Sequence, residues 1–138
     1  AIYDFYIGHT KYVNNWALVD SSAGYIVGQY LVGKKRDELY RLATSKLLWE
    51  RRIAIVATYA FIRNNEFDDT IALAEILLKD THDLMHKAVG WMLREMGKRD
   101  EKVLVTFLDK HSSVMPRTML RYAIEKFPEA KRKHYMLL

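Results

Sequence analysis

The chain has 138 residues, half of them apolar or aromatic, and a formal net charge of +5. This length and composition fit one domain with a buried core and exclude a disordered tail. The absence of cysteine excludes disulfides, thiolate metal ligands and cysteine nucleophiles, and is typical of a cytoplasmic protein. The longest uncharged run, Ser21–Gly33, is shorter than the roughly 20 apolar residues of a membrane helix, so no membrane partner is expected.

The positive charge is concentrated in the last third of the chain. Lys98–Leu138 contains ten Lys and Arg against five Asp and Glu, whereas residues 1–97 contain twelve of each kind. A polyanion such as nucleic acid is therefore a reasonable partner. Because many basic surfaces bind nothing, the charge alone does not assign a function.

The apolar spacing predicts two helices at the start of the chain. Residues 1–12 form the first, with no signal that would start it. Asn14 or Asn15 can cap the second, which runs to about Leu31 and is ended by Gly33. The serines and glycines within the second helix make it weak by intrinsic propensity.

Two further helices are expected before residue 64. Arg36–Ala43 is short, and Thr44 or Ser45 can cap a longer helix over Leu47–Arg63. The longer helix is almost entirely apolar from Ile53 to Ile62, which predicts a central place in the fold.

The second half of the chain continues in the same manner after a turn at Asn64 and Asn65. The expected helices are one opened by Asp68 or Asp69, one over His82–Lys98 capped by Thr81 and closed by Gly97, one over Glu101–Lys110, and one that starts at Pro116 and stops at Pro128.

The pattern predicts an all-α fold in a single domain over residues 1–138. No run alternates apolar and polar residues, and no Asn-Gly or Asp-Gly hairpin signal is present. The second helices of successive pairs begin near Leu47, His82 and Pro116, a recurrence of roughly 35 residues that is typical of helical solenoids. We therefore expect an α-α superhelix in which the second helices line one concave side.

The helix over His82–Lys98 has one apolar side, typical of a core-facing helix, and another side that combines a tryptophan with cations. Its core stripe on a helical wheel consists of Met85, Ala88, Val89, Met92 and Met96. Trp91 lies outside that stripe, among Lys87, Arg94 and Lys98. Such a tryptophan is well placed to meet something flat and negatively charged, or it packs on the next helix with the charges extending around it.

A carboxylate occupies an apolar position on an earlier second helix. Asp20 lies four residues after Trp16, hence on the same face, and its other neighbours are small apolar residues. Gly24, one turn further on, leaves room for another molecule to approach. Burial would raise the pKa of Asp20 and cost stability unless a cation or hydrogen-bond donors compensate.

Arg52 is also a charged residue at an apolar position of its helix. Its neighbours on the helical wheel are Leu48, Trp49 and Tyr59, and the adjacent charged residues, Glu50 and Arg51, face other directions. An arginine on an apolar side requires an anion. That anion is either Asp20, in a buried salt bridge that joins two repeats, or a phosphate. Both interpretations remain open from spacing alone.

Four blocks of this sequence resemble the AlkD-like DNA alkylation repair enzymes. They are NNWALVD at residues 14–20, WERRIAIV at 49–56, HKAVGWMLREMGKRD at 86–100 and PRTMLRYAIEKFPE at 116–129. The resemblance runs over nearly the whole chain and implies a HEAT/ARM-like helical-repeat fold. It also implies a DNA glycosylase that removes N3- or N7-alkylated purines from double-stranded DNA in base excision repair, without a metal or other cofactor.

The resemblance also implies roles for individual residues. Asp20 corresponds to the catalytic carboxylate, Trp16 and Trp91 to the two tryptophans of the cleft, and Arg52 to its arginine near the DNA backbone. The predicted further contacts to DNA are made by Arg51, Lys87, Arg94 and Lys98. The family's domains carry further helices upstream, which we expect this chain to lack.

Other signals favour no second chemistry. His82 and His86 are one turn apart as in a zinc helix, but the motif's glutamate is replaced by Asp83 and no third ligand is evident. His111 with the two following serines fits a loop between helices better than a nucleophile. The alternatives to a glycosylase are a non-catalytic helical-repeat module that binds nucleic acid and a scaffold that binds proteins.

Overall fold

The computed structural model describes residues 2–8 and 23–137. Every regular element in these two ranges is helical. The elements are α1 (Ile2–Gly8), the π-helical turn η2 (Ala23–Gly28), α3 (Gln29–Leu31), α4 (Asp37–Ala43), α5 (Leu48–Val56), α6 (Tyr59–Ile62), α7 (Asp68–Leu77), α8 (Asp83–Arg99), α9 (Glu101–His111), α10 (Arg117–Ala123) and α11 (Glu129–Met136).

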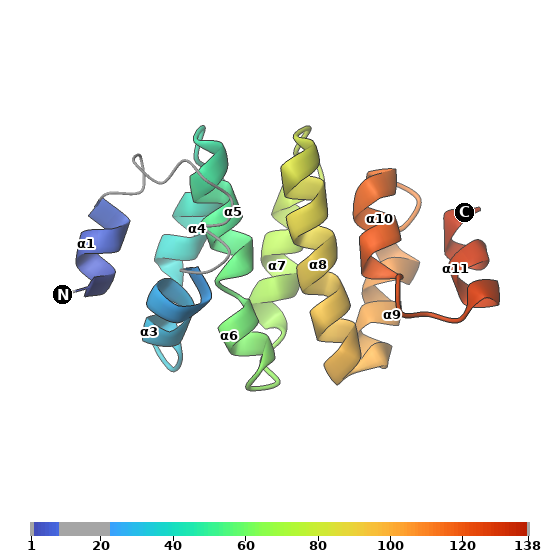
Figure 1. Ribbon diagram of the computed structural model, residues 1–138, viewed down its shortest axis with the longest axis horizontal. Coiled ribbons are helices and arrows are strands. Elements are labelled where there is room, and N and C mark those ends of the chain that lie inside the picture. Colours follow the sequence, from blue (N-terminus) through green and yellow to red (C-terminus); the bar gives the residue numbers. More distant parts are fainter. Residues whose placement is uncertain (1, 9–22, 138) are drawn as a thin grey trace.

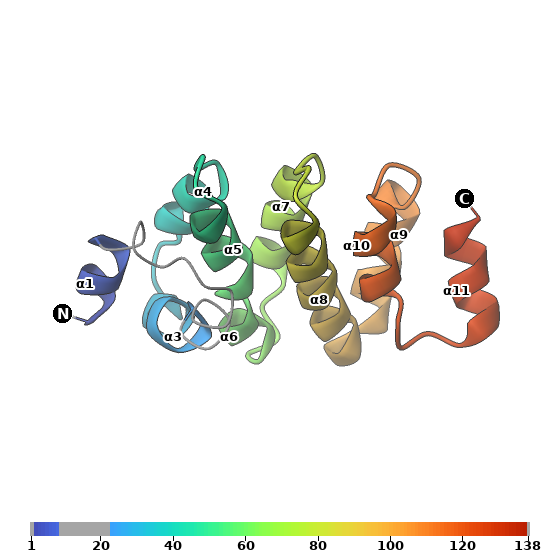
Figure 2. The same cartoon turned by 45° about the horizontal axis from the view of Figure 1, so that its top comes forward.

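The helices stack in pairs along the long axis of the molecule (Figure 1). Helices α4, α7 and α9 form a rear layer, and α5 with α6, α8 and α10 form a front layer. Figure 2 shows the same succession of pairs after rotation, with the two chain ends at opposite ends of the stack. The front helices begin at Leu48, Asp83 and Arg117, which confirms the predicted all-α class and the recurrence of roughly 35 residues.

The core lies between the two layers, and α8 supplies its centre. All five residues of the predicted stripe, from Met85 to Met96, are fully buried. Leu39 and Leu42 of α4 and Leu73 of α7 are also fully buried, on the rear side of the core. Each of these leucine, methionine and valine side chains contributes about 1.5–3 kcal/mol through removal of apolar surface from water.

The helix predicted over residues 47–63 is divided in two, so that prediction was wrong in its extent. α5 ends at Val56 and α6 begins at Tyr59. Thr58 takes a tighter turn, in which its backbone N–H and its hydroxyl both donate to the carbonyl of Ile55, at 3.1 and 2.6 Å. This break faces Gly28 of η2, where a Cβ atom would collide with the carbonyl oxygen of Ala57.

Two predicted boundaries of α8 were also wrong. The N-cap is His82 rather than Thr81, because the His82 ring Nδ1 accepts the backbone N–H of Leu84 at 3.1 Å. Gly97 lies within the helix, which continues to Arg99. A Cβ on Gly97 would collide with the Leu104 side chain, so this glycine lets α9 pack closely rather than ending α8.

Neither Thr44 nor Ser45 is the N-cap of α5, so that prediction was wrong: the N-cap is Leu47, which makes no side-chain cap hydrogen bond. The Ser45 hydroxyl instead accepts the N–H of Leu47 at 3.0 Å and donates to Glu50 at 2.5 Å, beside the start of the helix. Two other local predictions are confirmed. Gly33 and Asn65 adopt positive φ angles of 74° and 60° in the turns predicted at those positions. The sequence made no prediction for α11, which follows Pro128.

Two tyrosine–aspartate hydrogen bonds join helices of different pairs. The Tyr40 hydroxyl donates to Asp69 at 2.7 Å, between α4 and α7. The Tyr135 hydroxyl donates to Asp109 at 2.9 Å, between α9 and α11. Burial, followed by the hydrogen bond to a carboxylate, raises the pKa of each phenol from 10.0 to about 12.

Among the described helices, none combines the length and apolar character needed to cross a membrane.

We expect Gly90→Ala to destabilise the protein. A Cβ on Gly90 would lie 2.5 Å from the Cβ of Tyr122 and 2.6 Å from the carbonyl oxygen of Met119, where α8 meets α10. The expected loss in the free energy of unfolding is about 1–3 kcal/mol by overpacking, which outweighs the roughly 1 kcal/mol that alanine gains in helix propensity. Urea denaturation measures it, with Gly97→Ala as the milder control because the Leu104 side chain can move. A Gly90→Ala variant more stable than the parent would contradict this packing.

The raised phenol pKa values predict a loss of stability at high pH. The phenols ionise near pH 10 in the unfolded state and near pH 12 in the native state. Their full contribution to the free energy of unfolding is therefore present below pH 10, and it is lost as the pH rises from 10 to 12. Tyr40→Phe and Tyr135→Phe should each remove one phenolate that titrates near pH 12 in ultraviolet absorbance. Each should also reduce the fall in stability. Titration of either phenol near pH 10 in the native protein would show that its hydrogen bond is absent.

Candidate nucleic-acid interface

Six of the eight predicted site residues lie in the described part of the chain. Trp16 and Asp20 fall between residues 9 and 22, outside the described residues. The other six are on two neighbouring helices of the front layer: Arg51 and Arg52 on α5, and Lys87, Trp91, Arg94 and Lys98 on α8.

The side of α8 opposite its buried stripe carries an aromatic residue among cations. Lys87, Trp91 and Arg94 are half-buried and Lys98 is exposed, in contrast to the methionines of the same helix. We call these four residues the Trp91 stripe. Helices α7 and α9 lie behind α8 and contact it (Figure 1). On the helical wheel the Trp91 stripe lies on the other side of α8 from the buried methionines.

Trp91 packs against a tyrosine of the neighbouring helix. Its ring lies 6.4 Å from that of Tyr59 on α6, centroid to centroid, with the planes tilted by 43°. Tyr59 is 38% exposed, so this aromatic pair belongs to the surface of the front layer. Tyr59 is not among the site residues predicted from the sequence. In the sequence, Tyr59 follows Arg52 by seven residues, which in an unbroken helix would place both on the same face. The break between α5 and α6 changes the rotation between the two residues, so this spacing does not predict where Tyr59 lies.

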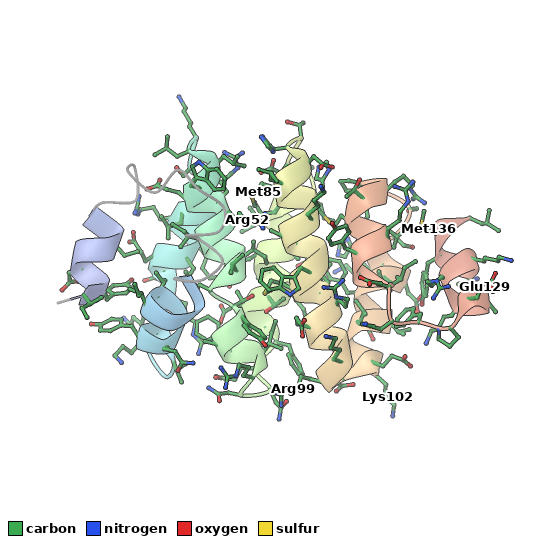
Figure 3. The ribbon with its side chains drawn as sticks, in the orientation of Figure 1. Arg52, Met85, Arg99, Lys102, Glu129 and Met136 are labelled. Carbon is green, nitrogen blue, oxygen red and sulfur yellow. The ribbon has the colours of Figure 1, made fainter. Side chains whose placement is uncertain are left out.

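Arg52 is buried at the boundary between α5 and α8 (Figure 3). Only 5% of the residue is exposed, and its Nη1 donates to the carbonyl of Leu84 at 2.5 Å. The prediction that Arg52 lies on an apolar, inward side of its helix is confirmed. Because Asp20 lies outside the described residues, both a salt bridge to Asp20 and a phosphate remain hypotheses for its anion.

Arg51 is held within the protein by three contacts. Its Nε lies 2.7 Å from Asp80, and its Nη1 donates to the carbonyls of Ser45 and Lys46 at 3.1 and 3.2 Å. The Asp80 side chain is 7% exposed. Arg51 therefore connects the start of α5 to the loop before α8. This structural role was not predicted from the sequence. The contact of Arg51 with DNA stays a prediction.

The three cations of the Trp91 stripe are each paired with an acid. Lys87 lies 3.3 Å from Asp83, and Lys98 lies 3.2 Å from Glu95, both on α8. Arg94 pairs with Glu125, which follows α10. Each of these pairs has at least one exposed partner, and ion pairs in contact with solvent contribute only about 0–1 kcal/mol each. The acids can therefore be exchanged for another anion at small cost.

The two histidines at the start of α8 contact the backbone. His82 caps the helix, and Nε2 of His86 lies 2.5 Å from the carbonyl oxygen of Asp80. His111 is the last residue of α9 rather than part of a loop, and its Nε2 lies 2.7 Å from a Glu75 oxygen. Within residues 2–8 and 23–137, no group of three or more His, Cys, Asp or Glu could hold a metal ion.

The fold and the Trp91 stripe define an α-helical repeat protein with an aromatic and basic surface on its front layer. The family model described as "DNA alkylation repair enzyme" matches residues 1–127. The chain therefore belongs to the family of DNA alkylation repair enzymes, which confirms the resemblance found in the sequence. No curated protein and no solved structure matched the chain. The matched range ends before α11.

The structural role of Arg51 can be tested by its removal. We expect Arg51→Gln to lower the free energy of unfolding by about 1–3 kcal/mol, because the buried carboxylate of Asp80 loses its cationic partner and keeps only the backbone N–H of His82. Arg63→Gln is the matched control, since Arg63 is exposed and its side chain has no partner among the described residues. Equal urea midpoints for the two variants would contradict a structural role for Arg51.

Proposed function

We propose that the protein is a DNA glycosylase that excises N3- and N7-alkylated purines from double-stranded DNA. The observation that carries this proposal is the match to the DNA alkylation repair enzymes over residues 1–127. The Trp91 stripe supports it, because it combines an aromatic surface with exchangeable cations on one side of α8. Cations that contact phosphates provide affinity that does not depend on sequence.

The chemistry of this reaction requires a single carboxylate. Alkylation at N3 or N7 makes the purine cationic, so its glycosidic bond is weak and the departing base needs little protonation. Positive charge then develops on the deoxyribose. In this proposal Asp20 stabilises that oxocarbenium-like sugar and orients or deprotonates the attacking water, the same logic that glycosidases use. The water oxygen forms the new bond to C1′, and the neutral purine leaves with the electron pair of the glycosidic bond.

The remaining residues hold the lesion against Asp20. Trp16 and Trp91 form aromatic walls whose π faces favour a cationic base or sugar, worth roughly 1–2 kcal/mol each when water is excluded. Arg52 grips a phosphate near the lesion. The cations of the Trp91 stripe contact the phosphates on either side, with Arg51 as a further predicted contact. Tyr59 supports Trp91 from the neighbouring helix.

The role of Asp20 is tested by Asp20→Asn. We expect this variant to lose release of 7-methylguanine from methylated duplex DNA, because a neutral amide cannot stabilise the developing positive charge. Binding of unmodified duplex should change by less than about threefold, since one charge among many contacts is altered. Asp68→Asn is the matched control: it removes the same charge at an exposed position of the rear layer, and its activity should equal that of the parent.

Three outcomes separate the proposal from its alternatives. Equal excision by Asp20→Asn and the parent would remove Asp20 from the mechanism. Salt-dependent duplex binding by the parent without any excision would indicate a non-catalytic nucleic-acid module. Absence of duplex binding would favour a scaffold for proteins, in which the arginines only pair with acids of the chain.

A further inference from the structure

The ion pair between Arg94 and Glu125 joins two repeats on the front layer. Arg94 lies one turn after Trp91 on α8, and its Nη1 donates to a carboxylate oxygen of Glu125. The carbon of the guanidinium lies 6.0 Å from the ring centroid of Tyr122, on α10. The pair therefore extends the Trp91 stripe towards the last repeat.

The two partners differ in how firmly the protein holds them. The Arg94 side chain is 18% exposed, whereas that of Glu125 is 55% exposed. Tyr122 and the body of α8 keep Arg94 in place, but the carboxylate can rotate into water. Exchange of this carboxylate for another anion thus requires movement of Glu125 and not of Arg94.

Glu125 does not satisfy the guanidinium completely. Nε of Arg94 is buried and has no hydrogen-bond partner among the described residues. A guanidinium carries five N–H donors in a planar fork, which fits the oxygens of a phosphate better than a contact through one nitrogen. Nε is out of reach of an approaching anion, but Glu125 contacts only Nη1, so a phosphodiester at the Trp91 stripe can accept from both terminal nitrogens of Arg94 where Glu125 accepts from one.

A groove beside Glu125 contains other cations with which its carboxylate can pair once it leaves Arg94. The groove lies between α10 and α11 and has a volume of about 530 Å³, and its lining includes Arg121, Arg132 and Lys133 as well as Glu125 and Glu129. Figure 3 marks Met136 and Glu129 on α11, which forms the far wall. In the described part of the chain, Arg121 has no ion-pair partner, so it can receive a displaced carboxylate.

We propose that Glu125 is a resident counterion of Arg94, which a DNA phosphate displaces when duplex DNA reaches the Trp91 stripe. The inference rests on the proposed function, because it assumes that this face binds DNA. Glu125 lowers the affinity of Arg94 for any duplex, since each binding event must first break the ion pair. It therefore limits how long the protein stays on undamaged DNA, where affinity is mostly electrostatic.

A double-mutant cycle on unmodified duplex DNA tests this proposal. Dissociation constants of the parent, Glu125→Gln, Arg94→Gln and the double variant are measured by fluorescence anisotropy over a range of salt concentrations. We expect Glu125→Gln to tighten binding about 3–10-fold at low salt and to steepen the salt dependence by up to about 0.9, the slope that one further phosphate contact adds. In the Arg94→Gln background the same change should alter binding by less than about twofold.

Glu129→Gln is the matched control, because it removes the same charge from the same groove but at a residue that pairs with Lys133. Its effect should be equal with and without Arg94. If Glu125→Gln also acts equally in both backgrounds, only net charge matters and the inference is overturned. If the parent does not bind duplex DNA at all, the proposed function fails and the inference fails with it. Glu125→Ser is a second variant without the carboxylate, and it should tighten duplex binding in the same direction as Glu125→Gln. A melting curve for each variant checks that the protein remains folded.

Discussion

The buried side of α8 is the surface against which the other helices are assembled. Its methionines, with Ala88 and Val89, are fully enclosed between the rear layer and the neighbouring front helices. Gly90 and Gly97 allow α10 and α9 to approach the backbone of α8, where a single added carbon would collide with them. Because this packing fixes how α8 is rotated about its axis, it also fixes which residues of α8 remain on the surface.

The candidate interface is thus a consequence of the core. Once the methionine stripe is buried, Trp91 and the three cations of its stripe must lie on the other side of α8. Tyr59 then meets Trp91 across the boundary between two repeats, and Glu125 meets Arg94 across the next. In both cases the contact joins residues that are far apart in sequence and belong to different repeats, so the interface is assembled by the stacking of repeats rather than by one motif.

Where the structure differs from the sequence-based predictions, the differences have specific physical causes. The break between α5 and α6 lies in a run that is apolar on every side, so periodicity carried no signal of it. Gly97 was interpreted as a helix end because glycine often ends helices, but here it is required for the close packing of Leu104. Arg51 was expected to contact DNA only, and its buried partner Asp80 is supplied by the loop before the next front helix, which spacing within α5 does not reveal.

The sequence by itself determined the all-α class, the recurrence of the front helices, the buried stripe of α8 and membership of the DNA alkylation repair family, because these depend on local periodicity and on ordered blocks of residues. Tertiary structure alone decided the pairing of Trp91 with Tyr59, the contact of Arg52 with Leu84 and the ion pair of Arg94 with Glu125. Each of these contacts depends on the distance and rotation between two helices. Those quantities are set by how side chains interlock at the boundary between repeats, and no pattern within a single helix records them.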